Sequence, residues 1–198
     1  ACHGCARHQP TRSLMNAAAQ SKSICLCVTG GIASYKAAHL TSRLTQAGIQ
    51  VHVAMTPAAT DFVGASTFLA LSGNPVHSSV GATTEAPYGA HIHLATHCDV
   101  LAVVPATANF LAKAAHGLAD CIASATYSAF DGDVFLAPAM NSSMWSNPAT
   151  QRNLQQLADD GCQILAPEEG WLSCRQQGTG RLQSISDILS TLLHCCNP

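Results

Sequence analysis

Charge and aromatic side chains are both scarce in this sequence. Asp, Glu, Lys and Arg make up 10% of the 198 residues, and Phe, Trp and Tyr make up 5%. The formal net charge of −2 provides no broad basic field, which argues against nucleic acid or an anionic membrane as a partner. The 47% of hydrophobic residues can bury a sizeable core.

The chain also lacks the marks of membrane insertion and secretion. No hydrophobic run approaches the roughly eighteen residues of a membrane span, and no charged segment followed by an apolar stretch resembles a signal peptide. We therefore expect a soluble, cytoplasmic protein.

Its ten cysteines are expected to be mostly free thiols, because disulfide scaffolds belong to short secreted chains. Five of them lie in apolar surroundings and are expected in the core: Cys25, Cys27, Cys98, Cys121 and Cys162.

Residues 1–22 contain no carboxylate and show no clear periodicity. This composition predicts a disordered extension or a remnant of expression, and a transit-like segment is the weaker alternative. Within it, Cys2 and Cys5 lie beside His3 and His8, but no second ligand pair follows at a defined spacing. We therefore predict no metal site.

Residues 23–198 alternate between strand-like and helix-like patterns, which predicts one domain. A β-rich run at 24–29, a helical spacing at 33–47 and a second strand at 49–55 form a βαβ unit. Further strands are expected at 100–104, 134–137 and 162–165, and further helices near 110–127, 148–160 and 185–193. The predicted fold is α/β, a doubly wound parallel sheet of the flavodoxin-like or Rossmann-like kind with helices on both faces.

Three turns follow strands of this sheet, after Thr29, Val104 and Ala137. They are expected to converge on one crevice, because ligands of doubly wound sheets bind beyond the carboxyl ends of the strands. Gly30 and Gly31 permit close approach of the backbone, and the following helix N-terminus suits a phosphate. The loop is not a G-x-G-x-x-G sequence and no acidic residue precedes Asp61, so a mononucleotide such as FMN is favoured over a dinucleotide.

The run from Ala137 to Trp145 places an uncharged amide directly after a strand. Pro138 cannot donate to a central ladder, so pairing is expected to end there. Asn141 then occupies an N-cap position. Two interpretations stay open: the amide only caps the next helix, or it also contacts a ligand.

This run resembles the PAMNxxMW signature of the homo-oligomeric flavin-containing cysteine decarboxylases. That family includes phosphopantothenoylcysteine decarboxylase and the peptidyl-cysteine decarboxylases of lantibiotic maturation. Four further segments resemble the family's motifs in the same order, so the resemblance spans about residues 24–183. They are the first flavin loop (29–36), the HIEL segment (His91 to Leu94), the PxSAN turn (105–109) and the ACGxxGxGRM flap (Cys174 with 178–182).

The resemblance implies bound FMN and a homo-oligomer, either a trimer or a trimer-based dodecamer. The family's trimers place FMN at subunit interfaces. One site can therefore contain His91 from one chain and the region of Asn141 from another. Asn109 is expected to support the flavin or Asn141. The resemblance assigns flavin contacts to Gly30, Gly31, Ala33, Thr56, Phe62, Thr107, Ala108 and Met140.

Decarboxylation of a cysteine needs an electron sink, because loss of CO₂ leaves negative charge on Cα. Removal of hydride from the thiol-bearing carbon by oxidised FMN gives a thioaldehyde, which can accept those electrons. By resemblance, His91 is the base, Asn141 binds the substrate carboxylate, and Cys174 on a flap at 168–183 protonates the enethiolate. Cys174 favours conversion of 4′-phospho-N-pantothenoylcysteine to 4′-phosphopantetheine, a step of coenzyme A biosynthesis.

Two other functions remain open. One is oxidative decarboxylation of the C-terminal cysteine of a ribosomal peptide to an aminoenethiol, because the residues flanking Cys174 depart from the usual ACGD. The other is a flavin-binding regulatory subunit of a phosphatase. Such proteins tend to carry long acidic tails, whereas residues 184–198 contain only Asp187.

Overall fold

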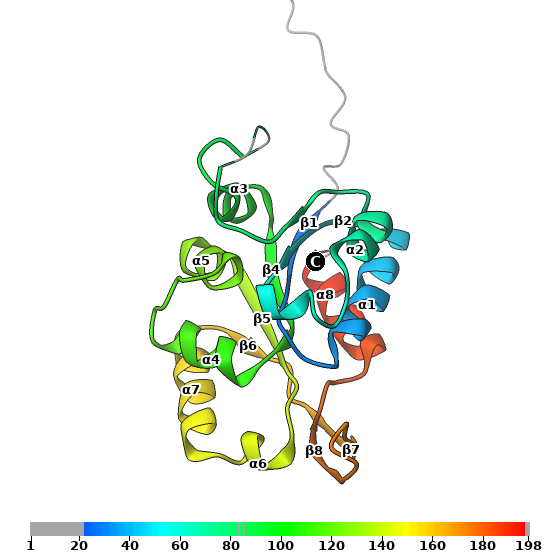
Figure 1. Ribbon diagram of the computed structural model, residues 1–198, viewed down its shortest axis with the longest axis vertical. Coiled ribbons are helices and arrows are strands. Elements are labelled where there is room, and N and C mark those ends of the chain that lie inside the picture. Colours follow the sequence, from blue (N-terminus) through cyan, green and yellow to red (C-terminus); the bar gives the residue numbers. More distant parts are fainter. Residues whose placement is uncertain (1–21, 83, 85, 197–198) are drawn as a thin grey trace, which may run out of the picture.

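The computed structural model describes residues 22–82, 84 and 86–196 of the chain (Figure 1). The predicted extension at 1–22, apart from Lys22, lies outside the described residues. The same is true of Cys2 and Cys5 with their neighbouring histidines.

Six parallel strands form the central sheet of the described chain, in the order β3-β2-β1-β4-β5-β6. This arrangement confirms the predicted doubly wound sheet, and the direction of winding reverses between β1 and β4. Ile24 of β1 pairs with Val51 of β2 on one side and with Val100 of β4 on the other. The strands are β1 (Ser23–Val28), β2 (Gln50–Met55), β3 (Val76–His77), β4 (Val100–Ala106), β5 (Asp133–Pro138) and β6 (Gln163–Ile164).

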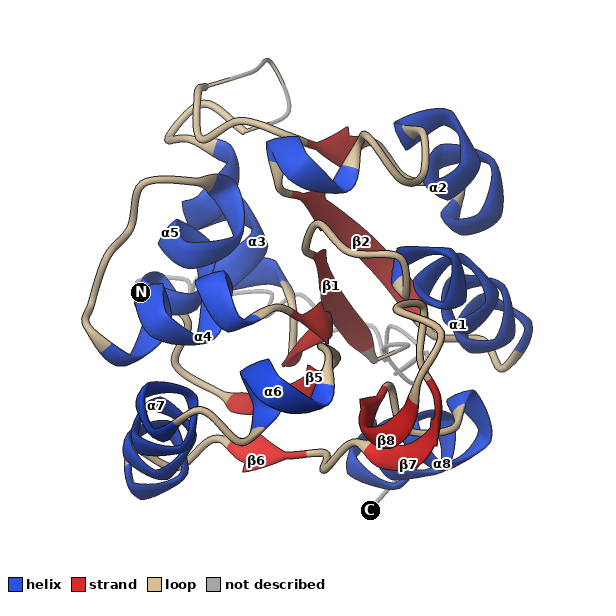
Figure 2. Ribbon diagram, turned by 60° about the horizontal axis from the view of Figure 1, so that its bottom comes forward, coloured by secondary structure: helices blue, strands red, loops and turns tan. Residues whose placement is uncertain are grey.

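Helices cover both faces of this sheet, which explains why its central strands β1, β4 and β5 are mostly apolar and do not alternate (Figure 2). One face carries α1 (Ser34–Gln46), α2 (Ala65–Ser72) and α8 (Ile185–Cys196). The other carries α3 (Ala90–His97), α4 (Ala108–Ala115), α5 (Ile122–Ala129) and α7 (Pro148–Asp159). All seven residues of β4 are buried.

Two parts of the fold differ from the sequence prediction. The single helix expected near 110–127 is two helices, α4 and α5, because the chain turns at Gly117 with a φ of 68°. Between Met55 and Val100 the sequence predicted no element, whereas the structure has η1 (Pro57–Ala59), α2, β3 and α3. These elements have at most eight residues, too few for a clear periodic signal.

A separate antiparallel hairpin interrupts the path from β6 to α8. Its strands are β7 (Glu168–Trp171) and β8 (Gln177–Arg181), and the predicted flap at 168–183 coincides with it. The short helix α6 (Ser142–Trp145) follows β5 and contacts β8. In Figure 2 the hairpin lies at the same end of the sheet as α6.

The cysteines of the described chain are free thiols, as expected. Cys25, Cys27 and Cys162 are buried in the core as expected, whereas Cys98 and Cys121 are half-buried and pack against the core from its edge, so for these two the prediction holds in part. Cys98 is the C-cap of α3 and Cys121 is the N-cap of α5. Among the described residues, no helix is both long enough and apolar enough to cross a bilayer.

Candidate active site

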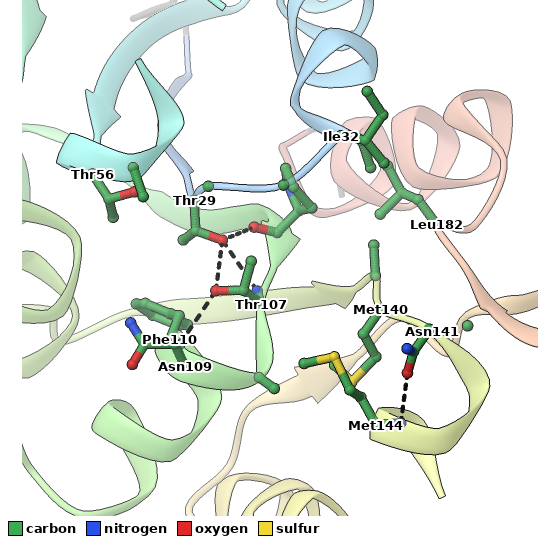
Figure 3. A pocket seen from close by; sticks show the side chains of 18 of the residues that line it. Thr29, Ile32, Thr56, Thr107, Asn109, Phe110, Met140, Asn141, Met144 and Leu182 are labelled. Atoms are coloured by element: carbon green, nitrogen blue, oxygen red, sulfur yellow. Dashed lines mark hydrogen bonds between the residues drawn. The ribbon is translucent and has the colours of Figure 1, made fainter. Parts of the chain in front are cut away.

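A cavity of about 1000 Å³ opens at the carboxyl edge of the sheet, where the winding direction reverses (Figure 3). The three turns predicted to converge do meet there, together with the turn after β2 and the base of the hairpin. Its lining includes Thr29, Gly31, Thr56, Thr107, Asn109, Met140, Asn141, Leu172, Arg181 and Leu182.

Two threonines hold the turns after β1 and β4 together. The Thr29 hydroxyl donates to the carbonyl oxygen of Pro105 at 2.6 Å and accepts from the backbone N–H of Thr107 at 3.1 Å. The two hydroxyls also lie 3.2 Å apart, and Thr29 is 1% exposed. Figure 3 shows this group below the first loop. Because these polar atoms are mutually satisfied away from water, the floor of the cavity is rigid.

The two adjacent glycines of the first loop serve different purposes. A Cβ on Gly30 would lie 2.5 Å from Cβ and 2.7 Å from the carbonyl carbon of Ala58, so this glycine is required by contact with η1. A Cβ on Gly31 would meet only Cγ2 of Thr107, at 3.7 Å. Gly31 therefore leaves open space on the cavity side, whereas Gly30 lets the first loop pack against Ala58 of η1.

Thr56 presents a polar atom that the described protein leaves unsatisfied. Its Oγ1 is buried and has no hydrogen-bond partner among the described residues, and the residue lines the cavity. A buried hydroxyl without a partner is costly. The atom is therefore suited to a polar ligand in the cavity, and it fits the predicted flavin contact.

Asn141 has the geometry for both interpretations of its amide. Its Oδ1 accepts a hydrogen bond from the backbone N–H of Met144 at 2.8 Å, so it caps α6 (Figure 3). Asn141 also lines the cavity. Capping uses only the oxygen, and the NH₂ group keeps two donors for a ligand.

The hairpin is held against the Asn141 turn by close backbone contact. The N–H of Met140 donates to the carbonyl oxygen of Gly180 at 3.0 Å. A Cβ on Gly180, whose φ is 133°, would overlap the carbonyl oxygen of Met140, and one on Gly178 would overlap the Ser142 hydroxyl. These glycines thus allow the flap to touch the turn that carries Asn141.

Most of the predicted site residues come together. Nine line the cavity: Gly30, Gly31, Ala33, Thr56, Thr107, Ala108, Asn109, Met140 and Asn141. Three do not line it within one chain, namely Phe62, His91 and Cys174.

None of these three side chains borders the cavity, although Ser173, directly before Cys174, does. Phe62 follows η1 and is 48% exposed, and it does not line the cavity of this chain. His91 lies in the first turn of α3, and its Nδ1 is buried with no partner among the described residues. Cys174 is exposed in the tight turn of the hairpin, next to Arg175 with a φ of 63°.

The structure adds three basic residues to which the sequence analysis gave no role, and one of them, Lys113, is paired with Asp120. Lys36 in the first turn of α1 and Arg181 at the end of β8 both line the cavity. Burial lowers the pKa of Lys36, and the nearby charge of Arg181 lowers it further, while Glu168 opposes them. Lys36 and Arg181 each lie inside a segment on which the family resemblance rests. Their positive charge within those segments was the sequence feature that could have marked them as site residues.

Known proteins resemble this chain over most of its length. The family model described as Flavoprotein matches residues 13–197. The chain belongs to this flavoprotein family. The resemblance stated from the sequence motifs is thereby confirmed.

Two curated relatives differ in how much of their length the chain spans. The coenzyme A biosynthesis bifunctional protein CoaBC of Bacillus subtilis is 42% identical over 169 residues, which are 85% of this chain and 42% of that protein. The chain thus spans about two fifths of the bifunctional relatives. A probable phosphopantothenoylcysteine decarboxylase of Streptococcus mutans is 40% identical over 174 residues, 87% of this chain and 97% of that protein.

Solved structures of the same fold extend the comparison. The FMN-dependent cysteine decarboxylase SpaF is 34% identical with a TM-score of 0.76, covering 91% of this chain and all but 1% of its own. A mutant PPC decarboxylase complexed with pantothenoylaminoethenethiol is 28% identical with a TM-score of 0.80, covering 90% of this chain and 100% of its own.

Proposed function

We propose that this flavoprotein binds FMN and decarboxylates a cysteine carboxylate, converting 4′-phospho-N-pantothenoylcysteine to 4′-phosphopantetheine and CO₂. The observation that carries the proposal is the cavity itself, which brings the Asn141 amide, the unpartnered Thr56 hydroxyl and the base of the hairpin together. The names of the Bacillus subtilis and Streptococcus mutans relatives support this substrate.

The residues present fit FMN. Gly31 leaves room at the first loop, Thr56 offers an unsatisfied buried hydroxyl, and Met140 is an apolar neighbour. Ala33, Thr107, Ala108 and Asn109 complete this proposed set. When bound, FMN supplies a two-electron acceptor for the thiol-bearing carbon and returns those electrons before the saturated thiol leaves.

Asn141 orients the substrate carboxylate in this proposal. A neutral amide can donate hydrogen bonds to a carboxylate without forming the ion pair that would stabilise it against loss of CO₂. Oδ1 is already fixed by the N–H of Met144, so the direction of the NH₂ group is set by the start of α6. The cap therefore determines the orientation of the donor.

His91 and Cys174 are proposed to move the protons. His91 accepts the thiol proton, and Cys174 protonates the enethiolate so that reduction is completed. Because neither residue lines the cavity of its own chain, the proposal requires a second copy to bring His91 to the site, as in a trimer or trimer-based dodecamer. Cys174 reaches the substrate when the hairpin tip folds inward.

Mass spectrometry of the products tests the proposal. FMN-loaded wild type is expected to remove CO₂ alone from 4′-phosphopantothenoylcysteine. Cys174→Ser is expected to release a product that lacks CO₂ and two hydrogens, because the enethiolate is not protonated. No turnover of this compound by flavin-loaded wild type would contradict the proposed substrate.

A second candidate is oxidative decarboxylation of a peptide that ends in cysteine. It is favoured by the sequence Ser173-Cys174-Arg175-Gln176 at the hairpin tip, where the resemblance predicts ACGD. The likeness to SpaF, an FMN-dependent cysteine decarboxylase, is compatible with this activity. Turnover of a cysteine-ended peptide, with loss of CO₂ and two hydrogens in wild type, would establish this activity instead.

A further inference from the structure

The hairpin end of the cavity carries more positive than negative charge. Lys36 comes from α1 and Arg181 from the end of β8, and both line the cavity. Glu168 is the carboxylate that balances them, and it binds the guanidinium directly. Among the described residues, one positive charge is therefore left without a counter-ion at this end.

Arg181 is held in a fixed position. Its Nη2 donates to Oε2 of Glu168 at 2.6 Å, and Oε1 of the same carboxylate accepts from the N–H of Ser184 at 2.7 Å. The guanidinium also lies over Gly170, where a Cβ would be 2.8 Å from Cζ. A guanidinium braced in this way keeps further N–H donors for an anion, and a planar fork suits phosphate oxygens.

The other lysine of the cavity lining is neutralised. Lys113 contacts both carboxylate oxygens of Asp120, at 2.7 and 2.9 Å. Lys36 has no such private partner among the described residues, and burial together with the charge of Arg181 lowers its pKa. An anion between Lys36 and Arg181 would remove their repulsion and favour the charged lysine.

We propose that Lys36 and Arg181 form the binding subsite for the phosphate monoester of the substrate. The inference rests on the proposed function and adds a basis for substrate choice. A cavity of about 1000 Å³ is at the upper limit of ordinary ligand sites, so a substrate fits beside a cofactor. In this proposal the cysteine carboxylate binds at Asn141 and the phosphate binds between Lys36 and Arg181, all of which line the same cavity. A peptide without phosphate gains nothing from this pair.

The first experiment compares phosphorylated and unphosphorylated substrate. The ratio of kcat/KM for 4′-phosphopantothenoylcysteine to that for pantothenoylcysteine is measured in wild type, Lys36→Met and Arg181→Met. Each substitution is expected to lower this ratio about tenfold, the worth of one charge-assisted contact. Arg43→Met is the matched control, because it removes one positive charge from the exposed last turn of α1 and leaves the ratio unchanged.

The second experiment needs no turnover. Calorimetry compares the binding of 4′-phosphopantetheine and pantetheine to the same FMN-loaded variants, and flavin fluorescence measures their affinity for FMN. Lys36→Met is expected to weaken the binding of 4′-phosphopantetheine, and to leave the binding of pantetheine and of FMN unchanged. A matching loss of FMN affinity would overturn the proposal, because the pair would then bind the flavin phosphate.

These measurements separate the two proposals. Wild type that decarboxylates both compounds with equal kcat/KM would overturn the phosphate subsite and leave the proposed function standing. Wild type that decarboxylates neither, yet binds the phosphorylated compound through Lys36, would remove the proposed function and support the subsite. Equal binding of both compounds by wild type would overturn the subsite whatever the activity.

Discussion

The two sides of the cavity are built in different ways. The floor consists of the turns after β1, β2 and β4, where Thr29 is buried and hydrogen-bonded across the sheet. The opposite side is the hairpin, whose residues are largely exposed and which meets the Asn141 turn and α6 at Gly180 and Gly178. A rigid floor suits a cofactor that stays bound, and a lightly attached wall suits a substrate that must enter and leave.

Replacing Thr29 by Val is expected to have the largest effect, because it breaks the floor. The change leaves the Pro105 carbonyl and the Thr107 N–H without their buried partner, so the free energy of unfolding should fall by about 3 kcal/mol. Urea unfolding of the apoprotein measures it. Thr41→Val is the control, because Thr41 is also fully buried but only donates to the Ala37 carbonyl within α1. Equal losses in the two variants would show that the floor has no special rigidity.

Replacing Asn141 by Asp tests the chemistry where floor and hairpin meet. Aspartate still caps α6, but it places a negative charge beside the substrate carboxylate. We expect kcat/KM to fall about a hundredfold, the size of a modest like-charge penalty, with stability unchanged. Asn147→Asp makes the same change at the N-cap of α7, whose Oδ1 accepts from Ala149 at 2.8 Å, and should keep activity. Full activity of Asn141→Asp would reduce the amide to a helix cap.

Replacing Gly180 by Ala tests the attachment of the hairpin. The new methyl group overlaps the Met140 carbonyl, so the hairpin must move away from the Asn141 turn. We expect kcat/KM to fall about tenfold, and the free energy of unfolding to fall by more than the roughly 1 kcal/mol that a positive φ alone costs an alanine. Gly48→Ala also places alanine at a positive φ, 83°, but has nothing within 4 Å. That control should lose about 1 kcal/mol of stability and retain activity.

The smallest effect concerns the pH dependence of the hairpin anchor. The N–H of Ser184 and the guanidinium of Arg181 hold the pKa of Glu168 below its usual range. Its contribution to stability is therefore present above the ordinary pKa near 4.5 and is lost as the pH falls through the lower folded value. At pH 7 the free energy of unfolding of wild type should exceed that of Glu168→Gln by less than about 1 kcal/mol, because the ion pair of Glu168 with Arg181 is partly exposed.

Urea unfolding from pH 7 to pH 3 measures this difference, which should shrink toward the acidic end. Glu169→Gln removes the neighbouring carboxylate, which forms no salt bridge within the described part of the chain. Its stability should follow wild type throughout. A difference between wild type and Glu168→Gln that grows on acidification would contradict the assigned direction of the pKa shift.

The sequence predicted the floor of the site better than its hairpin side. Strand-length apolar runs with a helical spacing between them were enough to place the turns after Thr29 and Ala137 at one edge. The short elements between Met55 and Val100 were missed, because eight residues or fewer show little periodicity. The break at Gly117 was missed because apolar residues continue on both sides of it.

Side-chain direction was the harder part of the site to predict. The resemblance grouped Phe62 and His91 with the cavity residues, but motif order carries no information on which chain a side chain faces. Lys36 and Arg181 are far apart in sequence, and only the return of β8 to the start of α1 brings both into the same lining. Their shared charge could be interpreted only after that contact was known.

The Glu168 carboxylate joins the beginning of the hairpin to its end, since it contacts both Arg181 and Ser184. The hairpin between these two contacts is closed at its base, and it takes no part in the pairing of β5 with β6. Its tip can therefore be lengthened, shortened or exchanged for that of a relative without shifting the register of the sheet. In such a scaffold, new substrate preferences can be acquired by transplanting about six residues, a loop length that compact folds accommodate readily.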